Sequence, residues 1–396
     1  MPVAARVDRF SYAIRNIVAE AAAVEARGIP VRYLNIGDPV QAGFRTPPHL
    51  IEAVERALRD NQNGYVPSAG IAPARAAVAA EYQARGVPMT PDRVLITTGT
   101  SEGIELALNA LVEEGDEVLV PLPTYPLYTA VLARISAQPR YYHADRQSWL
   151  PDIDHLRSLI TPRTRALVVI DPNNPTGAVY PPSTRRALLE LAEEHDLAIL
   201  ADEVYSDLGF DGPTPLLGSL DVDAAVISFS GLSKAYLAPG WRTGWAVVGR
   251  TPRLDATLAA MKKLADGRLC SPGPMQYAVR AALEGDRSHQ AAFREALAER
   301  GCLTAERLNA IPGMSCVPPR AAFYTMPSVT LPPGKTDEDY VLGLLRETGV
   351  LGVNGSGFGM PRGDGTFRLV FLKPPEELSG IFDEIDRFTR DFLARG

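Results

Sequence analysis

Short strand-like segments that alternate with helical patterns constrain the fold of this chain more than any other feature. Seven such segments lie between residues 93 and 248: Arg93–Thr98, Glu117–Pro121, Pro139–His143, Ala166–Ile170, Ala198–Asp202, Ala224–Ser228 and Trp245–Val248. Between the first two, Ile104, Ala107, Leu108, Leu111 and Val112 recur at the spacing of one helix face. This order of strand, helix and strand predicts an α/β fold, in which a mostly parallel sheet of seven strands lies between helices.

The pattern changes at about Asp286, where the strand-and-helix alternation stops. A long helix is expected first, then short strands, then a closing helix from Glu376; the ranges are Ala291–Ala310 for the long helix and Met314–Val317, Phe323–Met326 and Phe367–Phe371 for the strands. We therefore expect three parts: an N-terminal segment (1–45) that packs with the small domain, a large cofactor-binding domain (46–285) and a small α+β domain (286–396).

Composition and charge exclude several classes of protein. The net charge of -7, without a basic block, argues against nucleic acid as a partner. The first 16 residues lack the apolar run of a secretory signal, and no apolar run approaches the roughly 18 residues that a membrane span requires. The three cysteines show no C-x-x-C spacing and the five histidines no metal-ligand spacing. We expect a cytoplasmic protein without a metal site.

Lys234 is the first candidate for chemistry. It closes the motif Ser230-Gly231-Leu232-Ser233-Lys234, which follows an expected strand and precedes Arg242. A lysine in such a Gly/Ser-rich loop can lie in a pocket, where loss of solvent lowers the pKa of its amine as Schiff-base chemistry requires. A lone Ser-Lys pair is more often a solvated loop, so the neighbouring motifs decide between the two interpretations.

Polar motifs follow three of the other expected strands. Asp202 ends one strand within Ala-Asp-Glu-Val-Tyr, and Asn174 lies in Asn-Asn-Pro-Thr-Gly after another. In Thr98-Gly99-Thr100-Ser101 a strand enters a helix, a place where backbone N–H groups and hydroxyls bind phosphate. Each motif alone also suits a helix cap or an ordinary turn. Because ligands bind beyond the carboxyl ends of parallel strands, we expect the three motifs to lie together.

In their order and spacing these motifs resemble the class I/II aminotransferases of pyridoxal-phosphate fold type I. The resemblance runs from about Tyr33 to the end and rests on A-D-E-x-Y, N-N-P-T-G and S-K-x(7)-R. It implies a cofactor, pyridoxal 5′-phosphate, which Lys234 would hold as a Schiff base. It also implies a homodimer that acts on small-molecule amino acids and 2-oxo acids.

The resemblance further implies a role for each matching residue. Lys234 would anchor the cofactor and move the proton at the substrate's α-carbon. The remaining cofactor contacts would be Asp202 to the pyridine nitrogen, Asn174 and Tyr205 to the phenolic oxygen, Tyr125 stacked on the ring, and Gly99, Thr100, Ser101, Ser233 and Arg242 at the phosphate. Tyr65 would reach the phosphate of the neighbouring subunit. Gly231 departs from the pattern, because many relatives carry a phosphate-binding hydroxyl there.

Two further residues would hold the substrate's α-carboxylate. Arg368 matches the family arginine whose planar guanidinium bonds both carboxylate oxygens, and Gly37 matches a backbone contact to the same group, with Asn174 nearby. In isolation each also suits a structural role, as an arginine on the surface of a strand or as a turn glycine.

The choice of substrate depends on weaker matches. Tyr12–Arg15, Leu34–Pro39 and Arg268–Cys270 resemble bacterial glutamate-pyruvate (alanine) aminotransferases, which predicts transfer from L-alanine to 2-oxoglutarate. We hypothesise that Arg15 meets the distal carboxylate of glutamate, although an ordinary surface arginine is about as compatible with the sequence. Aspartate, or a broad or aromatic range, remains the alternative; Glu102, where a basic group would favour a dicarboxylate, leans toward alanine.

Functions outside transamination stay open at the level of the fold. Elimination and decarboxylation use the same scaffold, so the fold supports the cofactor more strongly than the reaction. A pyridoxal-phosphate-binding regulator of transcription would need a DNA-binding domain. The 45 residues before the expected large domain are too few and not basic enough for one.

Overall fold

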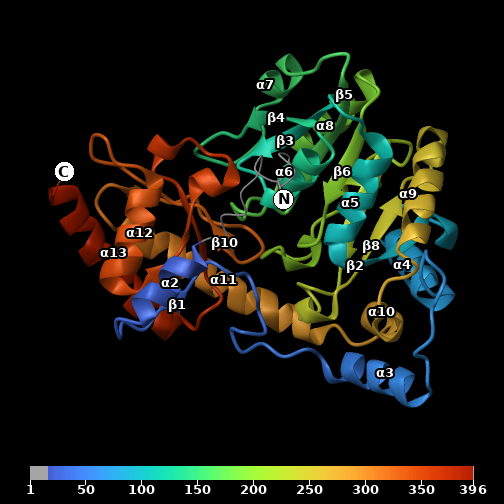
Figure 1. Cartoon of the computed structure of the whole chain (residues 1–396), viewed down its shortest axis with the longest axis horizontal. Helices are drawn as coiled ribbons and strands as arrows, with labels where there is room; N and C mark the ends of the chain where they lie inside the picture. Colours follow the sequence, from blue (N-terminus) through green and yellow to red (C-terminus); the bar gives the residue numbers. More distant parts are fainter. Residues whose placement is uncertain (1–16, 396) are drawn as a thin grey trace, which may run out of the picture.

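A computed structural model describes residues 17–395 and has a seven-stranded sheet at its centre (Figure 1). The strand order is β2-β8-β7-β6-β5-β3-β4. The bounds are β2 Val94–Thr98, β3 Glu117–Leu122, β4 Gln138–His143, β5 Thr164–Ile170, β6 Ala198–Asp202, β7 Val226–Gly231 and β8 Thr243–Val248. All pairs are parallel except those of β8, which runs antiparallel to β2 and to β7. The predicted fold class, with a mostly parallel sheet of seven strands, is confirmed.

Helices cover both faces of this sheet, as the alternation of side chains in β5 requires. Ala166, Val168 and Ile170 pack in one core cluster, whereas Leu167 and Val169 pack in another on the opposite face. The first cluster contains side chains of α5 (Gly99–Leu111), α6 (Pro126–Arg134) and α9 (Asp255–Gly267); the second contains those of α7 (Ile153–Ser158) and α8 (Pro182–Glu194). Each buried Val, Leu or Ile side chain among them contributes about 1.5–3 kcal/mol.

A third cluster joins the edge of the sheet to the rest of the chain. Helices α3 (Pro48–Arg59), α4 (Ala72–Ala84) and α10 (Gly273–Glu284) pack beside β2 and β8. The same cluster continues into α11 (Ser288–Asn309), the longest helix, which Figure 1 shows running from the sheet toward the C-terminal half. The sequence predicted this helix within three residues of its observed start and one of its observed end.

The C-terminal half contains short strands and two more helices. Helix α12 (Asp337–Thr348) begins at a capping box formed by Thr336 and Asp339, and α13 (Pro375–Ala394) closes the chain. The small sheets are β10-β14-β13, β11-β9 and β1-β12, with β1 Arg32–Tyr33, β9 Met314–Ser315, β10 Tyr324–Thr325, β11 Ser328–Val329, β12 Val350–Leu351, β13 Val353–Asn354 and β14 Phe367–Val370.

The start of the described chain lies against this half. Strand β1 pairs in parallel with β12, and α2 (Val18–Glu25) contacts α12, as Figure 1 shows in blue beside orange. The division into domains at residues 45 and 285 stays a prediction. Within residues 17–395, no helix combines the length and the apolar character that crossing a membrane requires.

Candidate active site

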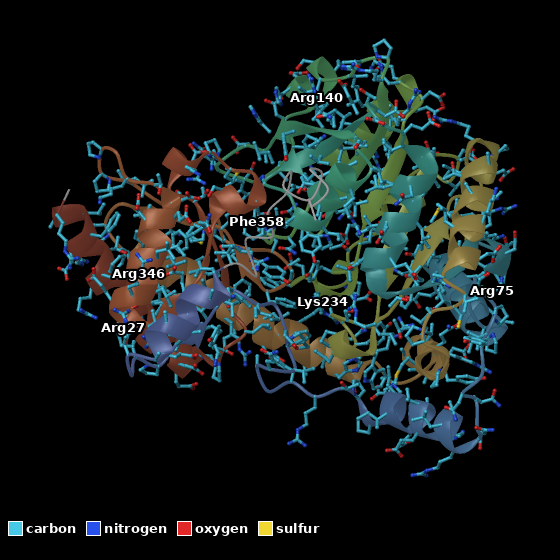
Figure 2. The ribbon with its side chains drawn as sticks, in the orientation of Figure 1. Arg27, Arg75, Arg140, Lys234, Arg346 and Phe358 are labelled. Atoms are coloured by element: carbon cyan, nitrogen blue, oxygen red, sulfur yellow. The ribbon has the colours of Figure 1, made fainter. Side chains whose placement is uncertain are left out.

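A cavity of about 780 Å³ opens between the carboxyl ends of the central strands and the C-terminal half. Figure 2 labels Lys234 in the region where the two halves meet. Residues from distant parts of the sequence line the cavity. They include Gly37, Thr100, Ser101, Tyr125, Asn174, Asp202, Tyr205, Ser233, Lys234, Arg242, Tyr324 and Arg368. The structure thus brings together most of the side chains that the motifs singled out.

Asp202 supplies a buried carboxylate at the end of β6. Its side chain is buried, and the Tyr128 hydroxyl donates to Oδ2 at 3.3 Å. Among residues 17–395, no donor makes a well-oriented hydrogen bond to Oδ1. Burial raises the pKa of Asp202 to about 6, although the Val204 backbone N–H, Tyr128 and Lys234 oppose the rise. A protonated ring nitrogen in the cavity would give this oxygen the donor that it lacks.

A cradle for an anion lies where β2 passes into α5. Gly99 takes a φ of +72°, and the Arg242 guanidinium lies so close that a Cβ at position 99 would overlap it. Thr100 and Ser101 follow at the first turn of this 13-residue helix, and Ser233 lines the same cavity. Backbone N–H groups of the first turn, hydroxyls and one guanidinium make a set of donors that fits a phosphate.

The structure explains why Gly231 carries no hydroxyl. Gly231 pairs with Gly244 across β7 and β8. A Cβ at position 231 would stand 2.8 Å from the Gly244 Cα and 2.8 Å from the Thr243 carbonyl oxygen. Real Cβ atoms essentially never approach backbone so closely, so a side chain is excluded here. Thr100, Ser101 and Ser233 remain the hydroxyls of the cradle.

Lys234 reaches the cavity from the loop between β7 and β8. Its Nζ donates to the Gly37 carbonyl oxygen at 2.8 Å and lies 5.4 Å from the centre of the Phe323 ring. Gly37 belongs to the N-terminal stretch and Phe323 to the C-terminal half. The amine therefore lies where all three stretches of the chain meet, with one hydrogen bond to a replaceable backbone acceptor.

Arg368 is held in β14 on the side of the cavity opposite the sheet. It is 2% exposed, and its guanidinium carbon lies 4.8 Å from the ring centres of both Tyr324 and Phe358. Nη1 donates to the Asn174 Oδ1 at 3.1 Å, and Nη2 to the Asn35 carbonyl oxygen at 2.5 Å. A guanidinium clamped between two rings and oriented by two acceptors suits recognition of a carboxylate.

Asn174 owes its position to a buried ion pair behind it. Arg185 in α8 donates to the Asp171 Oδ2 at 2.6 Å, and the Tyr180 backbone N–H donates to Oδ1. Both charged side chains are almost fully buried. The pair closes the loop from Asp171 to Tyr180 at both ends, so Asn174 projects from a loop whose ends are tied together.

Three functional neighbours were missed in the sequence. Tyr324 and Phe358 hold Arg368, and Tyr128 holds Asp202. Tyr125 is the N-cap residue of α6 and Tyr128 lies in the first turn of that helix, so the position of Tyr128 close after Tyr125 could have revealed it. Tyr324 lies in an expected strand, but only the pairing of β10 with β14 brings it to Arg368.

Of the predicted site residues, Tyr65 lies outside this cavity. The Tyr65 side chain is 87% exposed and lines a separate groove with Asn63, Gly64, Thr98 and Cys270. Arg15 lies outside the described residues. The role of each stays a prediction.

Comparison with known proteins gives a match over nearly the whole chain. The family model described as aminotransferase class I and II matches residues 30–385. Glutamate-pyruvate aminotransferase AlaA of Escherichia coli (strain K12) is 38% identical, with 97% of this chain and 96% of that protein covered. An alanine aminotransferase of Mycobacterium tuberculosis (strain H37Rv) is also 38% identical, and the match covers 97% of this chain and 91% of that protein. The solved structure of an alanine aminotransferase from Pyrococcus furiosus has a TM-score of 0.95 at 39% identity, and the match covers 98% of this chain and 100% of that chain.

Proposed function

The chain belongs to the class I and II aminotransferases, and we propose that its cavity binds pyridoxal 5′-phosphate and transfers the amino group of L-alanine to 2-oxoglutarate, giving pyruvate and L-glutamate. One observation carries the proposal. A lysine amine, a buried carboxylate oxygen without a partner in the described chain, and a buried guanidinium line the same cavity. Family members generally depend on this cofactor, which supports its assignment here.

The residues of the cavity fit the parts of the cofactor. The Asp202 Oδ1 would accept from the pyridine nitrogen, and the hydroxyls of the α5 cradle with Arg242 would hold the phosphate. Asn174 and Tyr205 would donate to the phenolic oxygen, while Tyr125 would cover one face of the ring. When bound, pyridoxal phosphate supplies an electron sink for the charge that develops at the substrate's α-carbon.

Lys234 would hold the cofactor and move the proton. Its amine hydrogen-bonds to the Gly37 carbonyl oxygen, an acceptor that it can leave and regain without disturbing a charged partner. Once the incoming amino acid has displaced it, the Lys234 amine would take the proton from the substrate's α-carbon and deliver it to C4′ of the cofactor. Arg368 would fix the α-carboxylate, and so hold the α-carbon within reach of Lys234.

The basic side chains of the cavity support alanine over aspartate. Among the described lining residues the lysines and arginines are Lys234, Arg242 and Arg368, and each already has a task in this scheme. Arg268 is held by Glu102 at 2.7 Å and by two backbone carbonyls. Among the described lining residues of the cavity, no cation is therefore left for the side-chain carboxylate of aspartate, whereas the methyl group of alanine needs none. The relatives named for alanine support the same choice.

Glutamate needs a cation for its distal carboxylate, and we assign this task to Arg15 on the sequence resemblance. Arg15→Ala is expected to slow the reaction with L-glutamate by about tenfold or more, because it removes one hydrogen bond to a charged group. The reaction with L-alanine should stay nearly unchanged. Single-turnover kinetics with each amino acid measure the two rates. Equal slowing of both reactions would remove Arg15 from glutamate recognition.

The direct test of the function is a steady-state comparison of amino donors. With 2-oxoglutarate as acceptor, kcat/KM for L-alanine should exceed that for L-aspartate and for an aromatic amino acid. The Lys234→Ala variant, measured in parallel, should be inactive with all three. A preference for aspartate would retain the enzyme class and reject alanine. Activity that survives loss of Lys234 would reject the assignment of the catalytic lysine.

A further inference from the structure

Beyond the residues assigned above, the cavity contains a hydrogen-bonded pair of phenols that joins the sheet side to the C-terminal half. The Tyr205 and Tyr324 hydroxyls lie 2.9 Å apart, and both side chains are buried. Their rings meet edge to face, with centres 5.6 Å apart and planes at 89°. Tyr205 follows β6, which ends at Asp202, whereas Tyr324 lies in β10. The contact therefore connects residues that are 119 positions apart.

Tyr324 also contacts both groups assigned to the substrate's α-carboxylate. Its ring lies 4.8 Å from the Arg368 guanidinium carbon. Its hydroxyl lies against the backbone of Gly37, where an added Cβ would overlap it. Tyr324 thus contacts Tyr205, the donor proposed for the cofactor, as well as Arg368 and Gly37, which are proposed to hold the substrate.

We propose that Tyr324 is a positioning residue, whose hydroxyl directs the Tyr205 proton toward the cofactor and whose ring orients Arg368 toward the substrate. The proposal rests on the function proposed above. A phenol has one proton to donate and lone pairs to accept with. When Tyr324 donates to the Tyr205 oxygen, the proton of Tyr205 remains available to an acceptor in the cavity, the phenolic oxygen of pyridoxal phosphate.

Either phenol can donate in this contact, and an acceptor in the cavity, the phenolic oxygen of the cofactor, would set the direction by taking the Tyr205 proton. Burial raises the pKa of Tyr205 well above its ordinary value, with Tyr324 the next cause and Tyr125 and Asp202 acting the same way. Tyr205 therefore keeps its proton and remains a donor. The Arg368 guanidinium lies over the Tyr324 ring, whereas the Tyr205 hydroxyl meets the Tyr324 hydroxyl, so substitutions that remove the hydroxyl alone or the ring as well test the two contacts separately.

Two substitutions separate the two tasks. Tyr324→Phe removes the hydroxyl and keeps the ring; it should raise the dissociation constant of pyridoxal phosphate about tenfold, the effect of one buried hydrogen bond, with the KM for L-alanine nearly unchanged. Tyr324→Leu removes the ring as well, and should in addition raise that KM by about threefold to tenfold. Cofactor affinity is measured by fluorescence titration of the protein stripped of cofactor.

A double-mutant cycle with Tyr205→Phe tests the link between the phenols. Once Tyr205 has lost its hydroxyl, Tyr324→Phe should no longer weaken cofactor binding, so the two effects should not add. Additive effects, or a dissociation constant for Tyr324→Phe within about twofold of the wild type, would overturn the proposal. A purely structural role would lower the melting temperature without changing that constant.

The same cycle separates this inference from the proposed function. If the wild-type protein bound no pyridoxal phosphate, the proposed function would fail first. The cycle would then be measured on the free energy of unfolding of the protein alone, where non-additive losses are still expected because the bond exists without the cofactor. Additive losses there would overturn the phenol pair as well.

Discussion

Asp202 and Glu203 are neighbours in the chain, but their carboxyl groups have different surroundings. Asp202 lines the cavity beside Tyr128, whereas the Glu203 Oε1 accepts the Leu217 backbone N–H at 2.6 Å. Burial raises the pKa of Asp202 to about 6 and that of Glu203 to about 7. Two acids with similar burial thus have separate tasks, and two substitutions distinguish them.

Asp202→Asn should lower kcat by about 100 to 1000-fold, because a neutral amide cannot balance a protonated ring nitrogen at the moment when charge develops. The fold should survive, since burial already disfavours the charged carboxylate. Steady-state kinetics with L-alanine measure the effect. The matched control is Asp211→Asn, which changes an exposed carboxylate paired with Arg320 on the surface. A loss of less than about tenfold would remove Asp202 from the reaction.

Glu203→Gln should change stability and its pH dependence. The folded protein binds this proton up to about pH 7, whereas the unfolded chain releases it near the ordinary pKa of 4.5. The contribution of Glu203 to the free energy of unfolding therefore falls as the pH rises from 4.5 to about 7, and it stays low at higher pH.

The glutamine variant lacks this loss, because its amide oxygen can still accept from Leu217 without ever carrying a charge. Its melting temperature should exceed that of the wild type above about pH 7 and approach it toward pH 4.5. Thermal unfolding across the window measures both, with the exposed Glu52→Gln as control. Parallel curves for wild type and Glu203→Gln would contradict the account.

At the level of elements, the long strands were predictable, as were the short strands β9, β10 and β14, whereas β1, β11, β12 and β13 were not. Ala198–Asp202 was predicted with its observed bounds, because a run of buried apolar residues is visible in sequence. Strand β7 begins two residues later than predicted and extends to Gly231, where pairing with Gly244 continues the ladder without apolar side chains. Two-residue strands such as β12 and β13 depend on tertiary partners, which no local pattern encodes.

In the candidate site, too, local motifs were predictable and contacts that depend on the tertiary fold were not. Motifs at the ends of long strands identified Asn174, Asp202 and Lys234, and the structure places these three on one cavity. Tyr324 and Phe358 were missed because their role is contact with Arg368, and that contact requires the folded C-terminal half.

Pairing of β7 with β8 also predicts that the missing hydroxyl cannot be restored. Gly231→Ser should destabilise the protein by about 1–3 kcal/mol, because the new side chain would press on the backbone of Thr243 and Gly244. Cofactor affinity should fall and not rise. Thermal unfolding and cofactor titration give the two results. Gly380→Ser, at a helix position where a Cβ meets nothing within 4 Å, is the control. A stable variant with tighter cofactor binding would contradict this packing argument.

At the level of the whole molecule, the cavity belongs to no single part of the chain. Gly37 comes from the N-terminal stretch, Asp202 and Lys234 from the sheet, and Arg368 from the C-terminal half. Tyr65 is the exception, since its exposed side chain lies outside this cavity. The sequence resemblance implies that it reaches the site of a second subunit, and we propose a dimer on this ground.

Complementation tests this arrangement. Tyr65→Ala and Lys234→Ala should each be impaired alone, because each damages every site of its own dimer. A mixed dimer of the two should contain one intact site, with Lys234 from one subunit and Tyr65 from the other. Co-expressed subunits should therefore recover a substantial fraction of wild-type activity. Activity no higher than the average of the two single variants would contradict a shared site.

The central claim is that Lys234 holds pyridoxal phosphate in a cavity suited to alanine, and the absorbance spectrum of the purified protein with added cofactor tests it most directly. We predict a visible band that L-alanine and L-glutamate abolish, that L-aspartate affects poorly, and that Lys234→Ala lacks. A band unchanged by any of these amino acids would contradict the proposed reaction. The absence of any band from the wild-type protein would contradict the cofactor itself.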